Sequence, residues 1–232
     1  MLDNSFYTFI VLSTINTTLG KIDTSTRFAQ TLDTLNSIRD KVPNSKIVFI
    51  DNSIDSLTSE QTAILKSQVD VFKAIDHNLF TLAANYNGLK GEGELYLMYE
   101  AIKLIKQHNL ISNRIFKISG RYFLNKYFNI EYYLNPDYYN KYIFKINVWD
   151  VSWDNFITKK TVIYFETRLW SFCSSLLNEY ERLMPIIFNY MIKIEDNLEM
   201  SLYSLLDHNK IVEFDVIGVT GISADTGIIK IE

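Results

Sequence analysis

The stretch FKISGRYF, residues 116–123, lies at the middle of the chain, where an apolar strand pattern gives way to polar and turn-forming residues. Its first half completes a predicted strand over residues 114–119, because apolar residues alternate there with polar ones and a glycine follows. Alternation along a strand places Lys117 and Ser119 on one face, with Arg121 following if the extended geometry continues. The stretch therefore predicts a central strand whose end carries three polar side chains.

Strands and helices alternate on the amino-terminal side of this stretch. An apolar, β-branched run predicts a buried strand over residues 6–15, and a polar loop follows over residues 16–26. A helix should begin with Ser25 or Thr26 as its N-cap, and its apolar positions recur at helical spacing before the strand Lys46–Asp51. These elements predict a βαβ unit.

The alternation continues up to the central strand. Thr58 and Gln61 have the spacing of a capping box, which predicts a short helix, and a β-rich run follows over residues 69–75. A glycine-bearing loop over residues 87–94 then leads into a helix with one apolar face. This order of elements is typical of an α/β fold.

The chain after the central strand is expected to be more antiparallel. The predicted elements are strands over 141–148 and 161–165, a helical pattern over 174–192 with Pro185 as a kink or a break, a helix over 195–206 and a strand over 210–217. The segment 218–227, rich in small polar residues, is expected to be either a mobile loop or a fixed strand and turn. No low-complexity linker or repeat divides the chain, so one mixed α/β domain over 1–232 is predicted.

Composition limits the classes of function. The 232 residues are 47% hydrophobic and 22% charged, as in an ordinary folded protein, and the net charge of −4 gives no basic footprint for nucleic acid. The single cysteine excludes a disulfide framework, and the three histidines lack zinc-ligand spacing. The first residues lack the features of a signal peptide, and no stretch reaches the ~18 apolar residues of a membrane span, so we expect a cytoplasmic protein.

Several short motifs, taken in order, carry a resemblance to a known family. They are an Arg-led helix at Arg27, IDNS at 50–53, a Lys-Gly loop, KISGRY at 117–122 and a late IED at 194–196. This order resembles the GT-A glycosyltransferases and, more narrowly, small glycosyltransferase-like proteins of bacterial surface-glycan and viral genomes. The resemblance implies a single GT-A-like, Rossmann-like domain with a mixed sheet flanked by helices. In it, residues 1–119 would form the nucleotide-binding half and residues 120–232 the acceptor-side half.

The resemblance implies a nucleotide-binding edge built from the ends of the first strands. Ser13 and Thr14 match the place where the family meets the nucleotide, in keeping with ligand binding beyond the carboxyl ends of strands. Arg27 matches a basic position that contacts the base or a phosphate, and Asp51 matches a carboxylate that holds the base or ribose. Each residue type also has a structural alternative, namely a polar loop, an exposed helix arginine, or a turn or N-cap aspartate.

Donor binding is also implied for Lys90, Lys117 and Ser119. The glycines beside Lys90 would let backbone amides approach an anion ahead of a helix N-terminus, although a flexible turn explains the same letters. Where the family holds its metal with an acidic pair, this chain has Ser119 and Arg121, and it contains no Asp-any-Asp motif. Arg121 is therefore the first candidate to stabilise the leaving diphosphate, and Lys117 is the second. The alternative places Lys117 at a sheet surface and pairs Arg121 with a structural carboxylate. The sequence requires no cofactor and leaves Mn²⁺ or Mg²⁺ open.

The late acidic motif implies a general base. By resemblance, Asp196 would remove the proton of the acceptor hydroxyl in an inverting displacement. Glu195 and Glu199 are competing bases. Acidic residues in the first turn of a helix also complement the helix dipole with no catalytic role.

The resemblance implies a glycosyltransferase of the hexosyltransferase kind, which moves a sugar from a nucleotide-sugar donor to a glycan or lipid-linked acceptor. A sugar-nucleotide nucleotidyltransferase is one alternative, disfavoured because the loop over residues 16–26 holds only one glycine and one lysine. A non-catalytic nucleotide- or glycan-binding module is the other. No nucleic-acid partner and no transmembrane segment are expected, and a peripheral membrane contact stays open.

Overall fold

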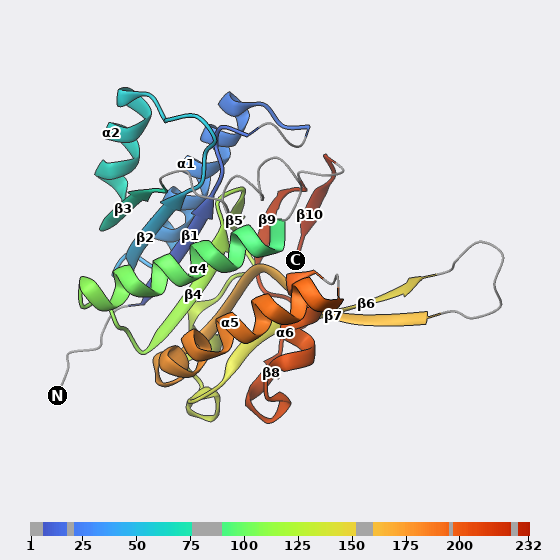
Figure 1. Ribbon diagram of the computed structural model, residues 1–232. Coiled ribbons are helices and arrows are strands. Elements are labelled where there is room, and N and C mark those ends of the chain that lie inside the picture. Colours follow the sequence, from blue (N-terminus) through green and yellow to red (C-terminus); the bar gives the residue numbers. More distant parts are fainter. Residues whose placement is uncertain (1–6, 18–20, 76–89, 152–159, 195–196, 224–226) are drawn as a thin grey trace.

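The computed structural model describes residues 7–17, 21–75, 90–151, 160–194, 197–223 and 227–232. Within these ranges the main sheet has seven strands in the order β3-β2-β1-β4-β7-β6-β8 (Figure 1). They are β1 (Thr8–Ser13), β2 (Lys46–Asp51), β3 (Val71–Ala74), β4 (Arg114–Ser119), β6 (Tyr142–Val151), β7 (Lys160–Cys173) and β8 (Ile211–Glu213). The first four strands in this order run parallel, whereas β7 is antiparallel to both β4 and β6. The predicted mixed α/β sheet is therefore confirmed.

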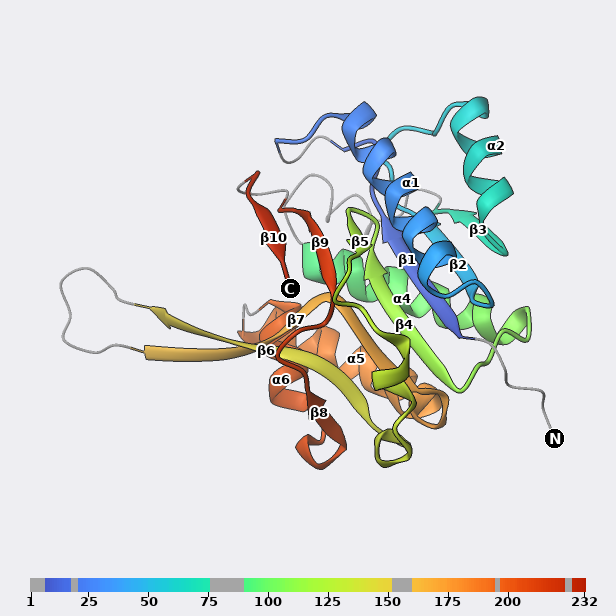
Figure 2. The ribbon, with the colours of Figure 1, turned by 180° about the vertical axis from the view of Figure 1, so that it is seen from behind.

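Helices cover both faces of this sheet. The α-helices are α1 (Thr24–Lys41), α2 (Ser59–Gln68), α4 (Lys90–Gln107), α5 (Leu177–Ile194) and α6 (Leu198–Leu205), and short 3-10 turns span Ile130–Leu134, Pro136–Tyr138, Ser174–Leu176 and His208–Lys210. Helices α4, α5 and α6 lie on the face seen in Figure 1, and α1 and α2 lie on the face seen in Figure 2. Alternation along β1 divides the core, because Ile10 and Leu12 pack on the α4 side while Phe9 and Val11 pack on the α1 side.

A second, antiparallel sheet in the described part of the chain contains β5 (Tyr122–Leu124), β9 (Val219–Ile222) and β10 (Ile229–Ile231). It brings the last strands back beside the residues that follow β4 (Figure 2). A Cβ atom on Gly221 would lie 2.5 Å from a ring carbon of Tyr122, so a glycine is needed for β9 to pass over this ring. The segment 218–227 therefore contains a strand, as in the second of the two predicted alternatives.

Two helix starts show how local hydrogen bonding sets the element boundaries. Asp23 is the N-cap of α1, and its carboxylate accepts hydrogen bonds from the backbone amide of Thr26 and from the hydroxyls of Ser25 and Thr26. The prediction of Ser25 or Thr26 as N-cap is wrong, because these residues donate to the cap. The capping box of Thr58 and Gln61 is confirmed at the start of α2.

The predicted glycine loop over residues 87–94 is wrong for its last residues. Helix α4 begins at Lys90, so Gly91 lies in its first turn. A Cβ atom on Gly91 would lie 2.7 Å from Met191 Cε and 3.1 Å from Leu198 Cβ. The glycine therefore allows α4 to approach α5 and α6 closely, which the sequence alone did not indicate.

The second half differs from its prediction mainly in the length of its elements. Strand β7 runs from Lys160 to Cys173, well beyond the predicted 161–165, and with β6 it forms a two-stranded arm that leaves the body (Figure 1). Helix α5 continues through Pro185, so the alternative of two separate helices is wrong. In the described ranges, no helix combines the length and the apolar character that crossing a membrane would need.

Candidate functional site

The carboxyl ends of β1, β2 and β4 form one polar edge of the main sheet. Ser13 pairs with Asp51 in the register between β1 and β2, and Leu12 pairs with Ser119 between β1 and β4. Ser13 and Asp51 are therefore direct neighbours, and Ser119 ends the adjacent strand β4 at the same edge of the sheet. Open α/β sheets bind ligands beyond this edge of their parallel strands, so it is the candidate site.

Ser13 is covered by the turn that follows β4. A Cβ atom on Gly120 would lie 2.9 Å from Ser13 Cβ, and the Gly120 amide donates to the carbonyl of Leu12 at 2.7 Å. Ser13 Oγ lies 3.1 Å from Thr31 Oγ1, and the hydroxyl of Thr31 has the carbonyls of Arg27 and Gly120 as acceptors. Ser13 is only 6% exposed and serves this hydrogen-bond network, so its role in donor binding stays a prediction.

Arg27 joins the first turn of α1 to the end of β1. Its Nη1 donates to the carbonyl of Thr14 at 3.1 Å, and its Nε donates to the carbonyl of Ile22 at 3.1 Å. The side chain is buried, so the alternative of an exposed helix arginine is wrong. These bonds hold the backbone of the β1–α1 connection at the polar edge, and contact of Arg27 or Thr14 with a donor stays a prediction.

Asp51 holds the chain that leaves β1. One carboxylate oxygen accepts from the Ile15 amide at 3.2 Å, and the other accepts from the Ser53 amide at 3.0 Å. The Ser53 hydroxyl accepts from the amides of Ile15 and Asn16 at 3.1 and 2.8 Å. Asp51 is 1% exposed, and burial raises its pKa to about 6 although the hydrogen bonds act in the opposite direction. The carboxyl group therefore shapes the edge, and its contact with a base or ribose stays a prediction.

Lys117 is enclosed on the α4 side of the sheet. Its Nζ lies 2.6 Å from Glu94 Oε1 and donates to the Thr167 carbonyl at 2.6 Å and to Ser119 Oγ at 3.0 Å. An ammonium group has three hydrogens, and these three oxygens use them all. The alternative of a surface lysine is wrong, because the side chain is 0% exposed. A direct diphosphate contact stays a prediction, and it would require one of these bonds to open.

The bond from Lys117 orients the hydroxyl of Ser119. Because an ammonium can only donate, Ser119 Oγ accepts from it and keeps its own hydrogen for another acceptor. Within the described ranges this hydroxyl has no second partner, and Ser119 is half-buried at the end of β4. Lys117 thus makes Ser119 a hydrogen-bond donor at the edge, suited to an oxygen of a phosphate group.

Glu199, one of the competing bases, lies beside this cluster at the start of α6. Its Oε1 accepts from the Thr167 hydroxyl at 3.1 Å. Burial raises the pKa of Glu199, and the nearby carboxylate of Glu94 adds to the effect. A carboxylate that binds its proton more tightly is a stronger base, so Glu199 stays a competing base.

Arg121 follows β4 but turns toward the second sheet. Its Nη1 donates to the Ile222 carbonyl of β9 at 3.1 Å, and the residue is half-buried. The extended geometry ends at Ser119, because Gly120 and Arg121 form a turn into β5. Lys117 and Ser119 therefore share a side as predicted, whereas the convergence of Arg121 with them is wrong.

A second charged cluster, which the sequence pattern did not predict, lies close to this edge. Arg168 of β7 donates to the carboxylates of Glu166 and Glu232 and, through Nε, to the Tyr122 hydroxyl at 2.9 Å. Leu169 pairs with Ile118, so Arg168 lies one step further toward the end of β4. The only signal in the sequence was the pair of charged residues Glu166 and Arg168, which interrupts the apolar pattern of β7.

The structure gives no support for a site role of the last three predicted residues. Asp196 and Glu195 lie outside the described residues, and Lys90 is the exposed first residue of α4. Among the described residues, no group of three His, Cys, Asp or Glu side chains is arranged to hold a metal ion. At the place where the resemblance implies an acidic pair, Ser119 and Arg121 do not fit a divalent cation, because a guanidinium has no lone pair to offer.

Parallel strands continued by antiparallel strands on one side, with a polar edge at the carboxyl ends, define a GT-A-like, Rossmann-like domain. Solved structures with a similar fold include the galactosyltransferase LgtC in complex with donor and acceptor sugar analogs, with a TM-score of 0.51, 11% identity, and coverage of 88% of this chain and 72% of that one. Core-mannan synthase A from Aspergillus fumigatus, in its Mn/GDP form, has a TM-score of 0.52 and 10% identity, with 92% and 73% covered. The bifunctional IspDF from Campylobacter jejuni has a TM-score of 0.52 and 14% identity, with 92% and 51% covered.

At these identities the likeness shows the fold alone, and it confirms the predicted GT-A-like fold. No family model matches the chain, and no match is found among curated proteins. The similar structures include glycosyltransferases and, in IspDF, a protein of another kind.

Proposed function

We propose that this chain is a glycosyltransferase that moves a sugar from a nucleotide-sugar donor to a hydroxyl of a glycan or a lipid-linked acceptor. The observation that carries the proposal is the polar edge of a GT-A-like sheet, where Ser13, Asp51 and Ser119 end three adjacent parallel strands. The nucleotide would lie over the ends of β1 and β2, in the half formed by residues 1–119. The acceptor would approach from the half formed by residues 120–232.

The leaving nucleotide diphosphate gains negative charge, which must be stabilised by groups already in place. Arg121 supplies a cation just after β4, and Ser119 supplies an oriented hydroxyl donor at its end. The charge of Arg168 is already paired with Glu166 and Glu232, so we assign Arg168 no contact with the diphosphate. Lys117 acts through Ser119. We propose no metal step, because the residues at this place do not fit a divalent cation.

The transfer itself needs a base for the acceptor. The acceptor oxygen forms a bond to the anomeric carbon while the bond from that carbon to the diphosphate breaks, and the hydroxyl proton passes to a carboxylate. Asp196 is the proposed base, with inversion at the anomeric carbon. This choice rests on the resemblance, and Glu199 stays the competing base, since burial raises its pKa and so makes its carboxylate more basic.

A panel of nucleotide diphosphate sugars, each tested for thermal stabilisation with chelator and with Mn²⁺, examines donor class and metal need together. We expect one donor to stabilise the wild type in chelator and Arg121→Ala to lose most of that shift, since a charged hydrogen bond contributes about 1.5–3 kcal/mol. Arg182→Ala, at an exposed arginine of α5, is the matched control. An undiminished shift in Arg121→Ala would contradict the role of Arg121.

A nucleotidyltransferase is the second candidate, favoured by the likeness to IspDF. Incubation with a sugar phosphate and a nucleoside triphosphate distinguishes a nucleotidyltransferase from a glycosyltransferase, because only the nucleotidyltransferase releases pyrophosphate. Donor binding with neither transfer nor hydrolysis, with and without divalent ions, would instead indicate a non-catalytic binding module.

A further inference from the structure

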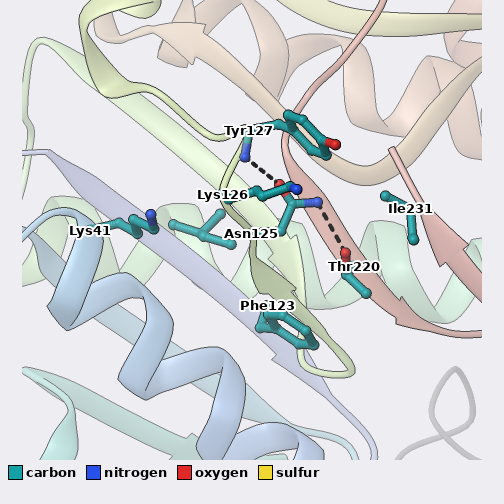
Figure 3. A pocket seen from close by; sticks show the side chains of 8 residues that line it. Lys41, Phe123, Asn125, Lys126, Tyr127, Thr220 and Ile231 are labelled. Atoms are coloured by element: carbon teal, nitrogen blue, oxygen red, sulfur yellow. Dashed lines mark hydrogen bonds between the residues drawn. The ribbon is translucent and has the colours of Figure 1, made fainter.

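A hollow of about 540 Å³ lies between the last turn of α1 and the second sheet (Figure 3). Lys41 borders it, and Arg27 in the first turn of α1 is 14 residues earlier, which is about 21 Å along the helix axis. Lys41 at the hollow and Arg27 at the polar edge therefore lie at opposite ends of α1. Its volume is within the range of small-ligand pockets.

The floor of the hollow is a row of side chains across the second sheet. Phe123 pairs with Thr220, and Thr220 pairs with Ile231. Since Tyr122 and Leu124 point into the core, alternation directs Phe123 outward, where it is 38% exposed. Tyr127, just after β5, adds a second aromatic ring that is 54% exposed. The hollow thus offers flat apolar ring faces to solvent.

Two hydrogen bonds hold polar groups in place beside these rings (Figure 3). Asn125 Oδ1 accepts from the Tyr127 amide at 2.8 Å, and Asn125 Nδ2 donates to Thr220 Oγ1 at 3.0 Å. Because Thr220 Oγ1 accepts this bond, its own hydrogen is left for another acceptor, and Asn125 Nδ2 keeps a second hydrogen. The fixed polar groups are therefore mainly donors.

The charge of the hollow has one sign. Among the described residues, Lys41 and Lys126 line it and no acidic side chain does, although the chain carries a net charge of −4. In the described ranges neither lysine forms an ion pair, and Lys126 Nζ lies 5.0 Å from the ring centroid of Tyr127. A favourable contact with the α1 dipole explains Lys41 but does not explain Lys126.

We propose that this hollow is a binding site for an anionic carbohydrate. The lysines would pair with a carboxylate or phosphate of the ligand, Asn125 and Thr220 would donate to its hydroxyls, and a sugar ring would pack on Tyr127 or Phe123. The choice of a carbohydrate among anionic ligands rests on the proposed function. The presence of a site for an anion rests on the lysines and donors alone.

The test is calorimetric titration of the full chain with a galacturonic acid trisaccharide. A neutral galactose trisaccharide shows whether the charge is needed, and an oligoglutamate peptide shows whether the sugar is needed. We expect only the acidic trisaccharide to bind, and its affinity to fall as salt is raised. Lys126→Gln and Tyr127→Ala should each weaken binding about fivefold, which corresponds to ~1 kcal/mol. Lys193→Gln, at an exposed lysine of α5, should leave it unchanged.

Four outcomes would overturn the proposal: no binding of the acidic trisaccharide, equal binding of the neutral one, equal binding of the peptide, or binding that survives both variants. Because Lys126 and Tyr127 are exposed, their variants should keep the wild-type melting temperature, which checks that they fold. Release of nucleotide diphosphate from a donor is measured in parallel. Intact release with no trisaccharide binding refutes the hollow alone, whereas intact binding with no release or transfer refutes the proposed function alone.

Discussion

Asp51 is an ionisable group that folding removes from water at the polar edge. Burial raises its pKa to about 6, so between about pH 4 and pH 6 the folded chain binds a proton more tightly than the unfolded chain. Proton linkage then makes the free energy of unfolding fall as pH rises through this window. A shift of about two units corresponds to a loss of about 3 kcal/mol from this group.

Urea denaturation at several pH values between 4 and 7 measures this effect. We expect Asp51→Asn to reduce the decline relative to the wild type, because an amide does not titrate. Asp55→Asn, at an exposed aspartate in the same loop, should keep the wild-type slope. If the curves of Asp51→Asn and the wild type were parallel, the titration of Asp51 would not contribute to stability.

At the scale of elements, the ion pair between Glu94 and Lys117 links α4 to β4. The two partners are unequal, because the Lys117 side chain is 0% exposed and that of Glu94 is 26% exposed. Removing Glu94 leaves a buried ammonium with only neutral partners, whereas removing Lys117 leaves a carboxylate that water can reach. We expect Glu94→Gln to lower the free energy of unfolding by about 3–5 kcal/mol and Lys117→Met to lower it clearly less.

Denaturant unfolding of the two variants and of the double variant measures this asymmetry. The double variant should be more stable than Glu94→Gln, since it no longer buries an unpaired charge. Equal losses in the single variants, or a larger loss for Lys117→Met, would contradict this account of the pair.

The elements that the sequence predicts well are those whose pattern is set locally. Strands β2 and β4 have the predicted bounds because their apolar runs are buried on both faces, and the capping box of Thr58 and Gln61 is a contact within one turn. The start of α4 was mispredicted because Gly91 is typical of a loop, while its use here is close packing against Met191 and Leu198. Such packing depends on helices that are distant in sequence.

At the scale of the whole molecule, the candidate site also has a part that the sequence predicts and a part that it does not. Position at a strand end follows from the order of elements, so the sequence could place Ser13, Asp51 and Ser119 at one edge. The pairing of Arg168 with Glu232 joins residues 64 apart and depends on how β7 meets the second sheet. The sequence pattern does not indicate that β7 packs against the second sheet.

The fold as a whole also predicts which amides a bound donor should protect from hydrogen exchange. A ligand that binds only the folded state at one hundred times its Kd raises the free energy of unfolding by about 2.7 kcal/mol, and this protects amides throughout the core from hydrogen exchange. Local contacts should add protection at the polar edge, over residues 13–16, 51–54 and 119–122. The hollow, over residues 123–127, should gain less than the ends of β1 and β2, because Lys41, which borders the hollow, lies about 21 Å from Arg27 along α1.

Amide hydrogen exchange followed by mass spectrometry, with and without the stabilising nucleotide sugar, measures this pattern. The acidic trisaccharide provides the internal control, since it should protect residues 123–127 and leave the polar edge at the global level. Two ligands that protect different segments of one domain establish two sites, whatever their affinities. If the nucleotide sugar instead protected residues 123–127 more than the ends of β1, β2 and β4, the assignment of the donor to the polar edge would be wrong.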